Sequence, residues 1–512
     1  MDKLHIGLIN DSFPPAIDGV ANAVTNYATV ITQQGGSAFV TTPYYPNADD
    51  SVFPFPVIRY PSIDTTKLLG YRAGLPFSAE TLRQVAERKP DLLHSHCPIT
   101  STMLARTLRE RIDVPIVFTY HTKFDVDIAN SIRGELLREE AIRLIVDNIS
   151  ACDEVWTVSY GAGENLRSLG YAGEYRVMPN GVDFPAGRVS DEAVKRETAR
   201  CDLPADVPLY LFVGRMMWYK GIRITLDALK HRMEAGADFR MVFIGAGGDY
   251  DEIMEYAASL GLAERVFFLG AIHERERIRA WYCRADLFLF PSTFDTNGLV
   301  VREAAACALP SVLIRGSCAA EDITDGQNGF LIEENAESMA DILERLTAET
   351  MKQTGEHAQR EIYLSWEDAV KNAYDRYGAV IEKYRSGTTA LREKPSDEFY
   401  EKMAELMEWQ ESNRQRQRAL QESFRNRLGE LRTELQLGGR EAGRERLRSR
   451  DDLKSEILRN RGMIRSEVQR NWDEIVADIR LNRALFHAEL EENRERLEDF
   501  LDDIMDWLDD II

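Results

Sequence analysis

The sequence lacks a closely spaced cysteine pair, a long apolar run and an apolar leader. Its six cysteines are scattered without any CxxC spacing, so neither a zinc framework nor a disulfide framework is expected, and a reducing compartment fits. No uninterrupted apolar run reaches the roughly 18 residues that a membrane span needs. The opening stretch MDKLHIGLIND meets an acid within its first apolar segment, so we expect no signal peptide. These absences predict a cytoplasmic protein whose membrane contact, where it has any, is peripheral.

Basic residues are also in deficit. The 63 Lys and Arg face 85 Asp and Glu, which gives a net charge of −22. This balance argues against a general nucleic-acid binder, whose surface would be basic. A local cluster of Arg and Lys can still bind an anionic ligand within an acidic protein. The 512 residues are too many for one core, so we expect two or three domains.

What the chain does have is two series of short apolar runs that alternate with amphipathic helical patterns. Such alternation predicts βαβ units and parallel sheets buried on both faces. The polar stretch 186–206 separates the two series. Ligands of these folds gather at the carboxyl ends of the strands and in clefts between domains. The first series reads LHIGLI, SAFVTT, DLLHSH, PIVFTY, EVWTVS and YRVMPNGV, and the second reads PLYLFVG, FRMVFIGAG, RVFFLG, DLFLFPS, PSVLIRG and GFLIEE.

The last part of the chain has a different composition. The segment 365–385 predicts one amphipathic helix that would close the second domain. From 395 onward, Leu and Ile recur at helical spacing, which predicts an all-helical, coiled-coil-like extension over 395–512. Residues 411–450 contain 11 Arg against 6 Glu, and residues 491–512 contain 10 acids against 2 Arg, so antiparallel docking of two helices is favoured. The extension would form a homo-oligomer, fold back on the α/β domains or bind a partner protein.

Two cations follow one of the predicted strands, in the stretch FVGRMMWYKGI. Arg215 and Lys220 lie five residues apart in what we expect to be a loop. Such a pair can bind a diphosphate, because Arg offers a forked contact and Lys a point charge. The alternative is a pair of solvated loop cations.

Two acids frame another strand exit, in the stretch FDTNGLVVREA. Asp295 lies in the turn, and Glu303 lies on a helix that is otherwise apolar. The first amides of that helix, near Gly298 and Leu299, would be free to bind a phosphate. A buried carboxylate such as Glu303 needs a partner, and adjacent sugar hydroxyls are good partners. The alternative is an acid that serves the helix dipole together with an internal salt bridge.

These motifs together resemble family 4 of the retaining glycosyltransferases, which have the GT-B fold. FVGRMMWYKG is followed by FLFPSTFDTNGLVVREAAACALPSV, and PNGVD, IGAGGD and EDITDGQNGFLI also match in the right order. The resemblance covers roughly residues 4 to 385. It implies two Rossmann-like domains that face a cleft, one over 1–188 for the acceptor and one over 189–365 for the nucleotide-sugar donor, followed by a closing helix over 366–390.

The resemblance also implies roles for single residues. Arg215 and Lys220 would neutralise the donor diphosphate in place of a metal ion, so no metal and no other cofactor is expected. Glu303 would bind the donor ribose, and Asp295 would lie beside the donor sugar hydroxyls. The catalytic set would be His121, Asp295, Arg215 and Lys220, and the donor-binding set would be Gly19, Arg215, Lys220, Asp295, Asn297, Gly298, Leu299 and Glu303.

Two positions depart from the family pattern. The family usually has glutamate where this chain has Asp295, and a Gly-Gly pair where it has Asp18-Gly19. The first departure bears on sugar choice, and the second adds a carboxylate near a phosphate site unless the side chain turns away. His94 and His96 are either acceptor-side residues that face the cleft or ordinary turn histidines.

The expected reaction is transfer of a hexose from a nucleoside diphosphate sugar, with a UDP-sugar favoured, to a hydroxyl of a glycan, lipid or protein. The resemblance implies retention at the anomeric carbon. Two alternatives remain open: a GT-B phosphorylase or epimerase, and an inactive scaffold whose helical tail mediates protein assembly. No nucleic-acid partner is expected.

Overall fold

The computed structural model describes residues 3–16, 18–66, 72–124, 135–387, 400–405, 407 and 412. By internal contacts the chain divides into Met1–Asn413 and Arg414–Ile512. Most of the helical extension expected over 395–512 therefore lies outside the described residues. Within the described residues, no helix has the length and apolar character needed to cross a bilayer.

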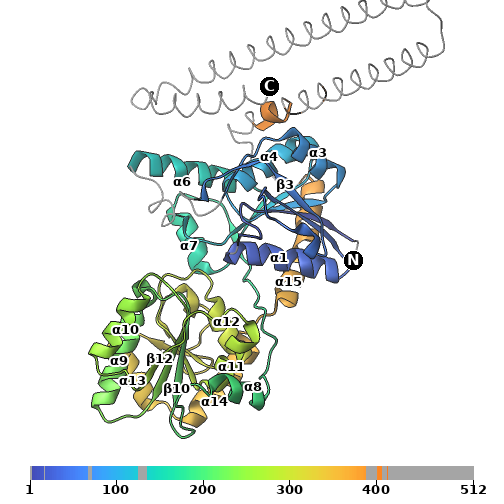
Figure 1. Cartoon of the computed structure of the whole chain (residues 1–512). Helices are drawn as coiled ribbons and strands as arrows, with labels where there is room; N and C mark the ends of the chain where they lie inside the picture. The colour runs from blue at the N-terminus through green and yellow to red at the C-terminus, as the bar shows by residue number, and fades with distance from the viewer. Residues whose placement is uncertain are drawn as a thin grey trace, which may run out of the picture. The chain divides into compact units, whose positions relative to one another are not determined.

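The first half is built on a seven-stranded sheet with the order β3-β2-β1-β6-β7-β8-β9, and all of its strand pairs are parallel. Its two faces carry separate apolar cores, one beneath α3, α4, α6 and α7 and one beneath α1 (Figure 1). The strands are β1 (His5–Ile9), β2 (Ser37–Pro43), β3 (Val57–Tyr60), β6 (Leu92–Ser95), β7 (Ile116–Tyr120), β8 (Glu154–Thr157) and β9 (Tyr175–Val177). The helices are α1 (Gly19–Gln33), α3 (Ala79–Glu87), α4 (Thr100–Ile112), α6 (Glu135–Ser150) and α7 (Tyr160–Ser168), with a 3-10 turn, η1 (Asp50–Val52).

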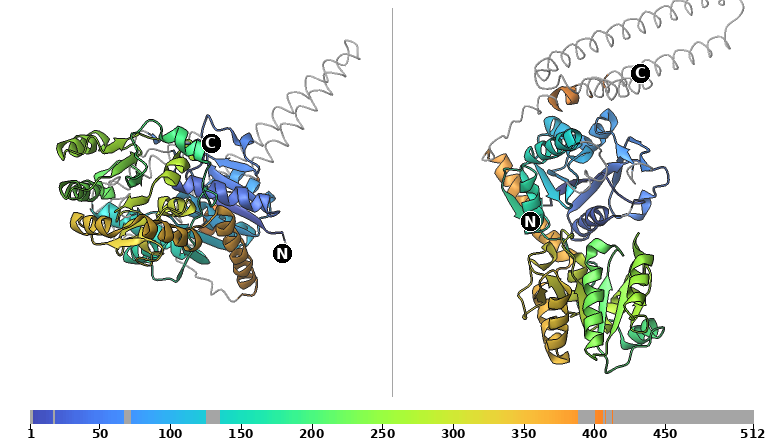
Figure 2. Two further views of the ribbon diagram at one scale, coloured as in Figure 1. Left: turned by 90° about the horizontal axis from the view of Figure 1, so that it is seen from below. Right: turned by 90° about the vertical axis from the view of Figure 1, so that its left-hand side faces the viewer.

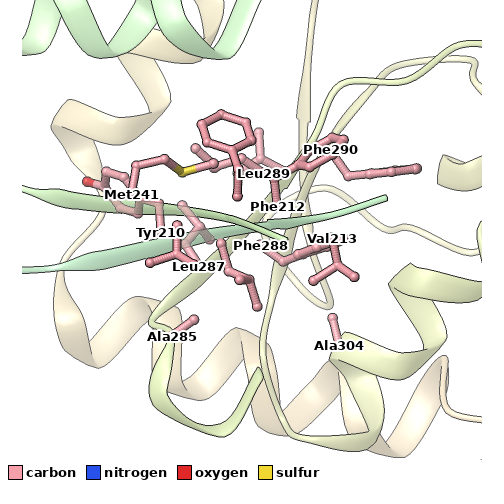
Figure 3. Close-up of a cluster of buried hydrophobic side chains, with 14 of the residues drawn as sticks. Tyr210, Phe212, Val213, Met241, Ala285, Leu287, Phe288, Leu289, Phe290 and Ala304 are labelled. Atoms are coloured by element: carbon pink, nitrogen blue, oxygen red, sulfur yellow. The ribbon is translucent and has the colours of Figure 1, made fainter. Parts of the chain in front are cut away.

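The second half repeats this plan with a six-stranded parallel sheet, in the order β12-β11-β10-β13-β14-β15. The central strands β10 (Leu209–Val213) and β13 (Leu287–Phe290) are buried along their whole length, and Phe212, Phe288 and Phe290 pack between the sheet and its helices (Figure 3). The other strands are β11 (Arg240–Ile244), β12 (Val266–Phe268), β14 (Ser311–Ile314) and β15 (Phe330–Ile332). The helices are α8 (Asp191–Thr198), α9 (Ile222–Glu234), α10 (Tyr250–Ser259), α11 (Arg275–Arg284), α12 (Leu299–Ala306), α13 (Ala336–Arg345) and α14 (Ala348–Glu361), with 3-10 turns η2 (Trp218–Lys220) and η3 (Cys318–Ala320).

The predicted double α/β architecture is confirmed, and each of the twelve apolar runs contains a strand. The sequence analysis missed β3 at the sheet edge, where buried and half-buried residues alternate over only four positions. It also missed the short antiparallel pair β4 (Ser62–Ile63) and β5 (Ala73–Gly74). Segments this short present too little apolar sequence to stand out from a loop.

The helix predicted over 365–385 is present as α15 (Trp366–Arg385), but its predicted place against the second domain is wrong. Its apolar stripe packs on the first half, against α1. In Figures 1 and 2 the orange ribbon of α15 lies against the blue first half. Ala369 and Ala373 belong to this buried stripe, and the Tyr374 hydroxyl accepts from the Leu4 amide at 2.8 Å. An amphipathic pattern fixes which face is buried and leaves open which core receives it.

A short helical segment beyond α15 also packs on the first half. Tyr400, Ala404 and Met407 are buried. The Tyr400 hydroxyl donates to Asn148 Oδ1 at 3.1 Å, and the Arg106 guanidinium lies 4.1 Å from the centre of the Tyr400 ring. Tyr400, Ala404 and Met407 are therefore part of the first half's packing.

Candidate functional site

The loop after β10 holds the two predicted cations in different environments. Arg215 is exposed, and its guanidinium carbon lies 5.9 Å from the centre of the Tyr219 ring. Lys220 is only 5 % exposed. Gly221 directly after it has φ 73°, and a Cβ there would lie 1.9 Å from the carbonyl oxygen of Pro291. Only glycine allows the backbone to come this close to Pro291. The loop that contains Lys220 therefore packs directly against the end of β13.

Lys220 is held by the acid predicted to face the donor sugar. Its Nζ donates to Asp295 Oδ1 at 2.7 Å, and Ser292 Oγ donates to Asp295 Oδ2 at 2.5 Å. The rings of Tyr219, Phe290 and Phe294 lie 5.6 to 5.9 Å from the ammonium. An ammonium has three protons, so the bond to Asp295 leaves two that can meet an anion. Arg215 forms no ion pair with any described residue.

Glu303 is buried on α12 and already has two partners. Arg275 donates to Oε1 at 2.6 Å, and the Tyr282 hydroxyl donates to Oε2 at 3.1 Å. Burial raises the pKa of Glu303, although the neighbouring Arg275 opposes this shift. The internal salt bridge named as an alternative is therefore present. A carboxylate has about four acceptor positions, so this pairing still leaves room for hydroxyls.

Arg275 and Tyr282, both on α11, were missed by the sequence analysis. Arg275 also lies 3.9 Å from Asp183 and stacks over Phe184 at 4.3 Å, which connects the PNGVD segment to Glu303. The charge-rich run HERERIR was the available signal, because a buried carboxylate on an apolar helix requires a cationic partner.

The start of α12 has the features of an anion-binding helix end. Gly298 is its N-cap with φ 58°, and no side chain caps the first turn within the described residues. The first amides of the helix, which starts at Leu299, therefore have no side-chain acceptor among the described residues. Asn297 adds a buried side-chain amide nitrogen that has no hydrogen-bond partner among the described residues. Three of the predicted donor-binding residues, Asn297, Gly298 and Leu299, thus offer unused donors at one helix terminus.

His121, at the end of β7, connects the two halves. Its carbonyl oxygen accepts from Thr296 Oγ1 at 2.9 Å, directly beside Asp295. Its ring Nε2 lies 2.9 Å from Nδ1 of His96. Burial lowers the pKa of His121 to about 3, so the ring is neutral at physiological pH.

The two histidines of the HSH motif are core residues. His94 has no exposed surface, and its ring nitrogens lie 2.6 Å from the Tyr377 hydroxyl and 2.7 Å from Thr119 Oγ1. His96 is also buried. The sequence left two alternatives for them, acceptor-side residues that face the cleft or ordinary turn histidines, and their burial fits neither. A strand end in a parallel sheet is accessible only where no helix covers it, and here α15 supplies Tyr377.

Gly19 is the first residue of α1 and is exposed. A Cβ there would meet no atom within 4 Å, so the backbone is open to a ligand. The neighbouring Asp18 caps the helix, since its Oδ1 accepts from the amides of Val20 at 2.8 Å and Ala21 at 2.7 Å. The carboxylate of Asp18, which departs from the family pattern, is therefore used to cap α1. That Gly19 contacts a donor phosphate stays a prediction.

A second connection between the halves was not foreseen. Glu321 from the second half accepts from the amides of Tyr160 at 2.6 Å and Gly161 at 2.5 Å, and so caps α7 of the first half. A cavity of about 30 Å³ adjoins it, lined by residues of both halves that include Ser159, Asn297 and Gly298. The start of α12 therefore adjoins a small interdomain cavity.

Comparisons with known proteins match both halves. The first matches the model described as Glycosyltransferase Family 4 over residues 17–184, and the second matches Glycosyl transferases group 1 over residues 207–349. A D-inositol 3-phosphate glycosyltransferase of Xylanimonas cellulosilytica is 30% identical over 327 residues, which are 60% of this chain and 77% of the relative. The chain belongs to glycosyltransferase family 4.

Further relatives of this glycosyltransferase have varied names. Alpha-monoglucosyldiacylglycerol synthase of Streptococcus pneumoniae is 24% identical over 352 residues, which are 67% of this chain and 79% of the relative. Among solved structures, sucrose-phosphate synthase of Thermosynechococcus elongatus superposes with a TM-score of 0.59 at 22% identity, and covers 74% of this chain and 100% of its own. Anabaena HepE in complex with UDP-glucose gives 0.57 at 19% identity, with 73% and 100% covered. These structures confirm the GT-B fold.

Proposed function

We propose that this glycosyltransferase moves a hexose from a nucleoside diphosphate sugar to an acceptor hydroxyl, with retention at the anomeric carbon and without a metal ion. The observation that supports this most is the pair of strand-exit loops after β10 and β13. They place the buried Lys220, with two protons to spare, next to Asp295 and to the uncapped start of α12. Cationic groups and free helix amides at one place are the elements of a diphosphate site.

In the proposed reaction, the bond between the anomeric carbon and the phosphate oxygen breaks as the acceptor oxygen attacks on the same face. The acceptor proton passes to the departing phosphate oxygen, so no covalent sugar–enzyme intermediate forms. Negative charge gathers on the departing diphosphate. This charge would be stabilised by Lys220, Arg215 and the amides at Gly298 and Leu299. Because these groups are already in place, no reorganisation of solvent is needed during the reaction.

Asp295 and Glu303 would orient the donor. The carboxylate of Asp295 would accept from sugar hydroxyls while it stays paired with Lys220. Glu303 would accept the ribose hydroxyls with the positions that Arg275 and Tyr282 leave free. His121 would face the sugar from the first half, next to Thr296.

The acceptor is proposed only as a chemical class. One relative is named for D-inositol 3-phosphate and another for monoglucosyldiacylglycerol, so the names of the relatives point to more than one class of acceptor. For this chain we propose a hydroxyl of a glycan, lipid or protein, with a UDP-sugar as donor ahead of GDP- and ADP-sugars. The preference for UDP rests on the family resemblance.

The test is a calorimetric screen of UDP, GDP and ADP in the presence of a chelator, followed by mass spectrometry and NMR of products from incubation with a cell extract. An α-configured product from an α-configured donor supports the proposal. An inverted product overturns retention. A nucleotide sugar that is consumed or epimerised without any acceptor indicates the phosphorylase or epimerase alternative, and binding of no nucleotide indicates the scaffold.

A further inference from the structure

A buried cluster of three histidines lies behind the donor site. His96 stacks between His94, at 4.0 Å between ring centres, and His121, at 5.2 Å. His94 has a hydroxyl partner at each ring nitrogen. His96 and His121 share one contact, 2.9 Å from His96 Nδ1 to His121 Nε2. This contact has to contain one proton, and which ring donates it decides what His121 can offer a substrate.

All three rings are neutral at physiological pH, so each has a single N–H. Burial lowers the pKa of His121 to about 3 and lowers the pKa values of His94 and His96 well below their usual range. The choice is therefore between two neutral arrangements, in which either His96 or His121 is the donor.

The surroundings of His96 Nε2 separate the two arrangements. This atom is buried and has no hydrogen-bond partner among the described residues. If His121 donated, the proton of His96 would lie on Nε2 as a buried N–H without an acceptor. The Tyr27 ring, 5.5 Å away and tilted by 68°, offers at best an aromatic face, which is a weak acceptor. If His96 donates, only a lone pair is left unsatisfied. Orphaned buried N–H groups are rarer than under-satisfied acceptors.

We propose that His96 is a positioning residue that donates its Nδ1–H to His121 Nε2 and thereby fixes His121 as the Nδ1–H tautomer. The Nδ1 of His121 forms no hydrogen bond with the described residues and, in contrast to His96 Nε2, is not among the buried atoms that lack a partner. It is the ring nitrogen left to meet a ligand. His121 therefore presents a hydrogen-bond donor to the donor site.

This inference rests on the proposed function for its chemical meaning. An Nδ1–H group donates to a sugar hydroxyl oxygen or a phosphate oxygen, and it has no lone pair with which to accept the acceptor's proton. His121 would then orient and stabilise the donor, while the departing phosphate takes the proton. Since the tautomer is a property of the free protein, it can be measured without any substrate.

The test is nitrogen NMR of the full-length protein labelled with ¹⁵N-histidine, without ligand, with the His121 signals assigned by comparison with His121→Asn. We expect a protonated-type shift at Nδ1 of His121 and an unprotonated-type shift at Nε2. The reverse pattern overturns the inference, whether or not the protein transfers a sugar. A correct tautomer together with absent nucleotide binding would instead contradict the proposed function alone.

Two variants test the role of His96. His96→Leu removes the donor, and we expect the His121 tautomer preference to be lost and kcat/KM for the donor to fall roughly tenfold. His96→Asn, whose side-chain nitrogen can occupy the place of Nδ1, should restore both. Tyr377→Phe is the control, because it removes a hydrogen bond to His94 in the same cluster without touching His121. It should lower thermal stability and leave the His121 shifts unchanged, and altered His121 shifts in this control would count against the inference.

Discussion

Lys220 and Asp295 form an ion pair of 2.7 Å between the loops that follow β10 and β13, two strands that are neighbours in the second sheet. The ammonium is almost wholly buried, whereas Asp295 remains partly exposed. A buried charge is costly unless it is paired, so Asp295 holds Lys220 in place while two of its protons remain available. In the proposed function, this pair would keep a cation ready for a diphosphate in the free protein.

Arg215→Ala separates charge stabilisation from folding. Arg215 is exposed and has no ion pair among the described residues, so the thermal midpoint should stay unchanged. Turnover of the nucleotide sugar should fall by about 10²–10³, the usual cost of losing one charge-stabilising contact. Lys230→Ala, a half-buried lysine on α9 that pairs with Glu234 at 3.8 Å, is the control and should leave turnover unaltered. Equal turnover of both variants would remove Arg215 from the site.

Asp295→Glu tests the departure from the family's usual glutamate. The longer side chain should keep a carboxylate near Lys220 and shift where it meets the sugar. We expect affinity for the free nucleoside diphosphate to change by less than about threefold, while the ratio of kcat/KM between UDP-glucose and other UDP-hexoses changes. Asp295→Asn, which loses the charge, should lower turnover with every sugar. An unchanged sugar ratio in Asp295→Glu would show that this carboxylate does not read the sugar.

Glu303 predicts a pH dependence of stability. Burial raises its pKa in the folded protein above the unfolded value of about 4.3. Its contribution to stability is therefore fully present below that unfolded value and is lost as the pH rises through the folded pKa. Chemical unfolding of the wild type and of Glu303→Gln between pH 4 and 8 should show the wild type losing stability relative to the variant just above the unfolded value. A difference between the two that is constant with pH would contradict the buried position of the carboxyl.

Glu321 should influence how the two halves are held together. Glu321→Ala leaves the amides of Tyr160 and Gly161 without their acceptor from the second half. We expect a loss of about 1 kcal/mol, as for other helix caps, and a larger radius of gyration by small-angle X-ray scattering. Glu333→Ala, an exposed acid on the same half, is the control. An identical scattering curve would show that this contact does not restrain the halves.

Two truncations test the segment around Tyr400. Removal of everything after residue 390 exposes Arg106 and Asn148, which Tyr400 contacts. We expect a lower thermal midpoint for this form than for one that ends after residue 412, and equal nucleotide affinity in both. Light scattering of the same proteins tests whether the extension makes an oligomer. Equal midpoints would show that the segment does not stabilise the first half.

Much of the fold was predictable because the buried strands are nearly continuous apolar runs. The runs LFLF in β13 and LYLFV in β10 are short, wholly apolar and bounded by Pro or Gly, which indicates buried strands. The strand-exit position of Arg215, Lys220 and Asp295 followed from the same pattern. The conformation of Gly298 was not predicted, although glycine at that position fits it.

What the sequence could not provide is the identity of partners that are far apart in the chain. A buried carboxylate such as Glu303 requires a cationic partner, but several arginines follow β12. Arg275 is the partner because α11 packs against α12. The burial of His94 depends on Tyr377, which lies 283 residues away on a helix that was expected against the other domain. Periodicity shows which face of a helix is buried. Which part of the protein covers that face depends on tertiary packing alone.

The most direct test is calorimetric titration of UDP, GDP and ADP into the full-length protein in the presence of EDTA, with Lys220→Ala alongside. We expect one of the three nucleotides to bind the wild type without any divalent ion, and Lys220→Ala to lose that binding while it remains folded by circular dichroism. A wild type that binds none of the nucleotides, or binds one only after magnesium or manganese is added, would contradict a metal-free diphosphate site between these two loops.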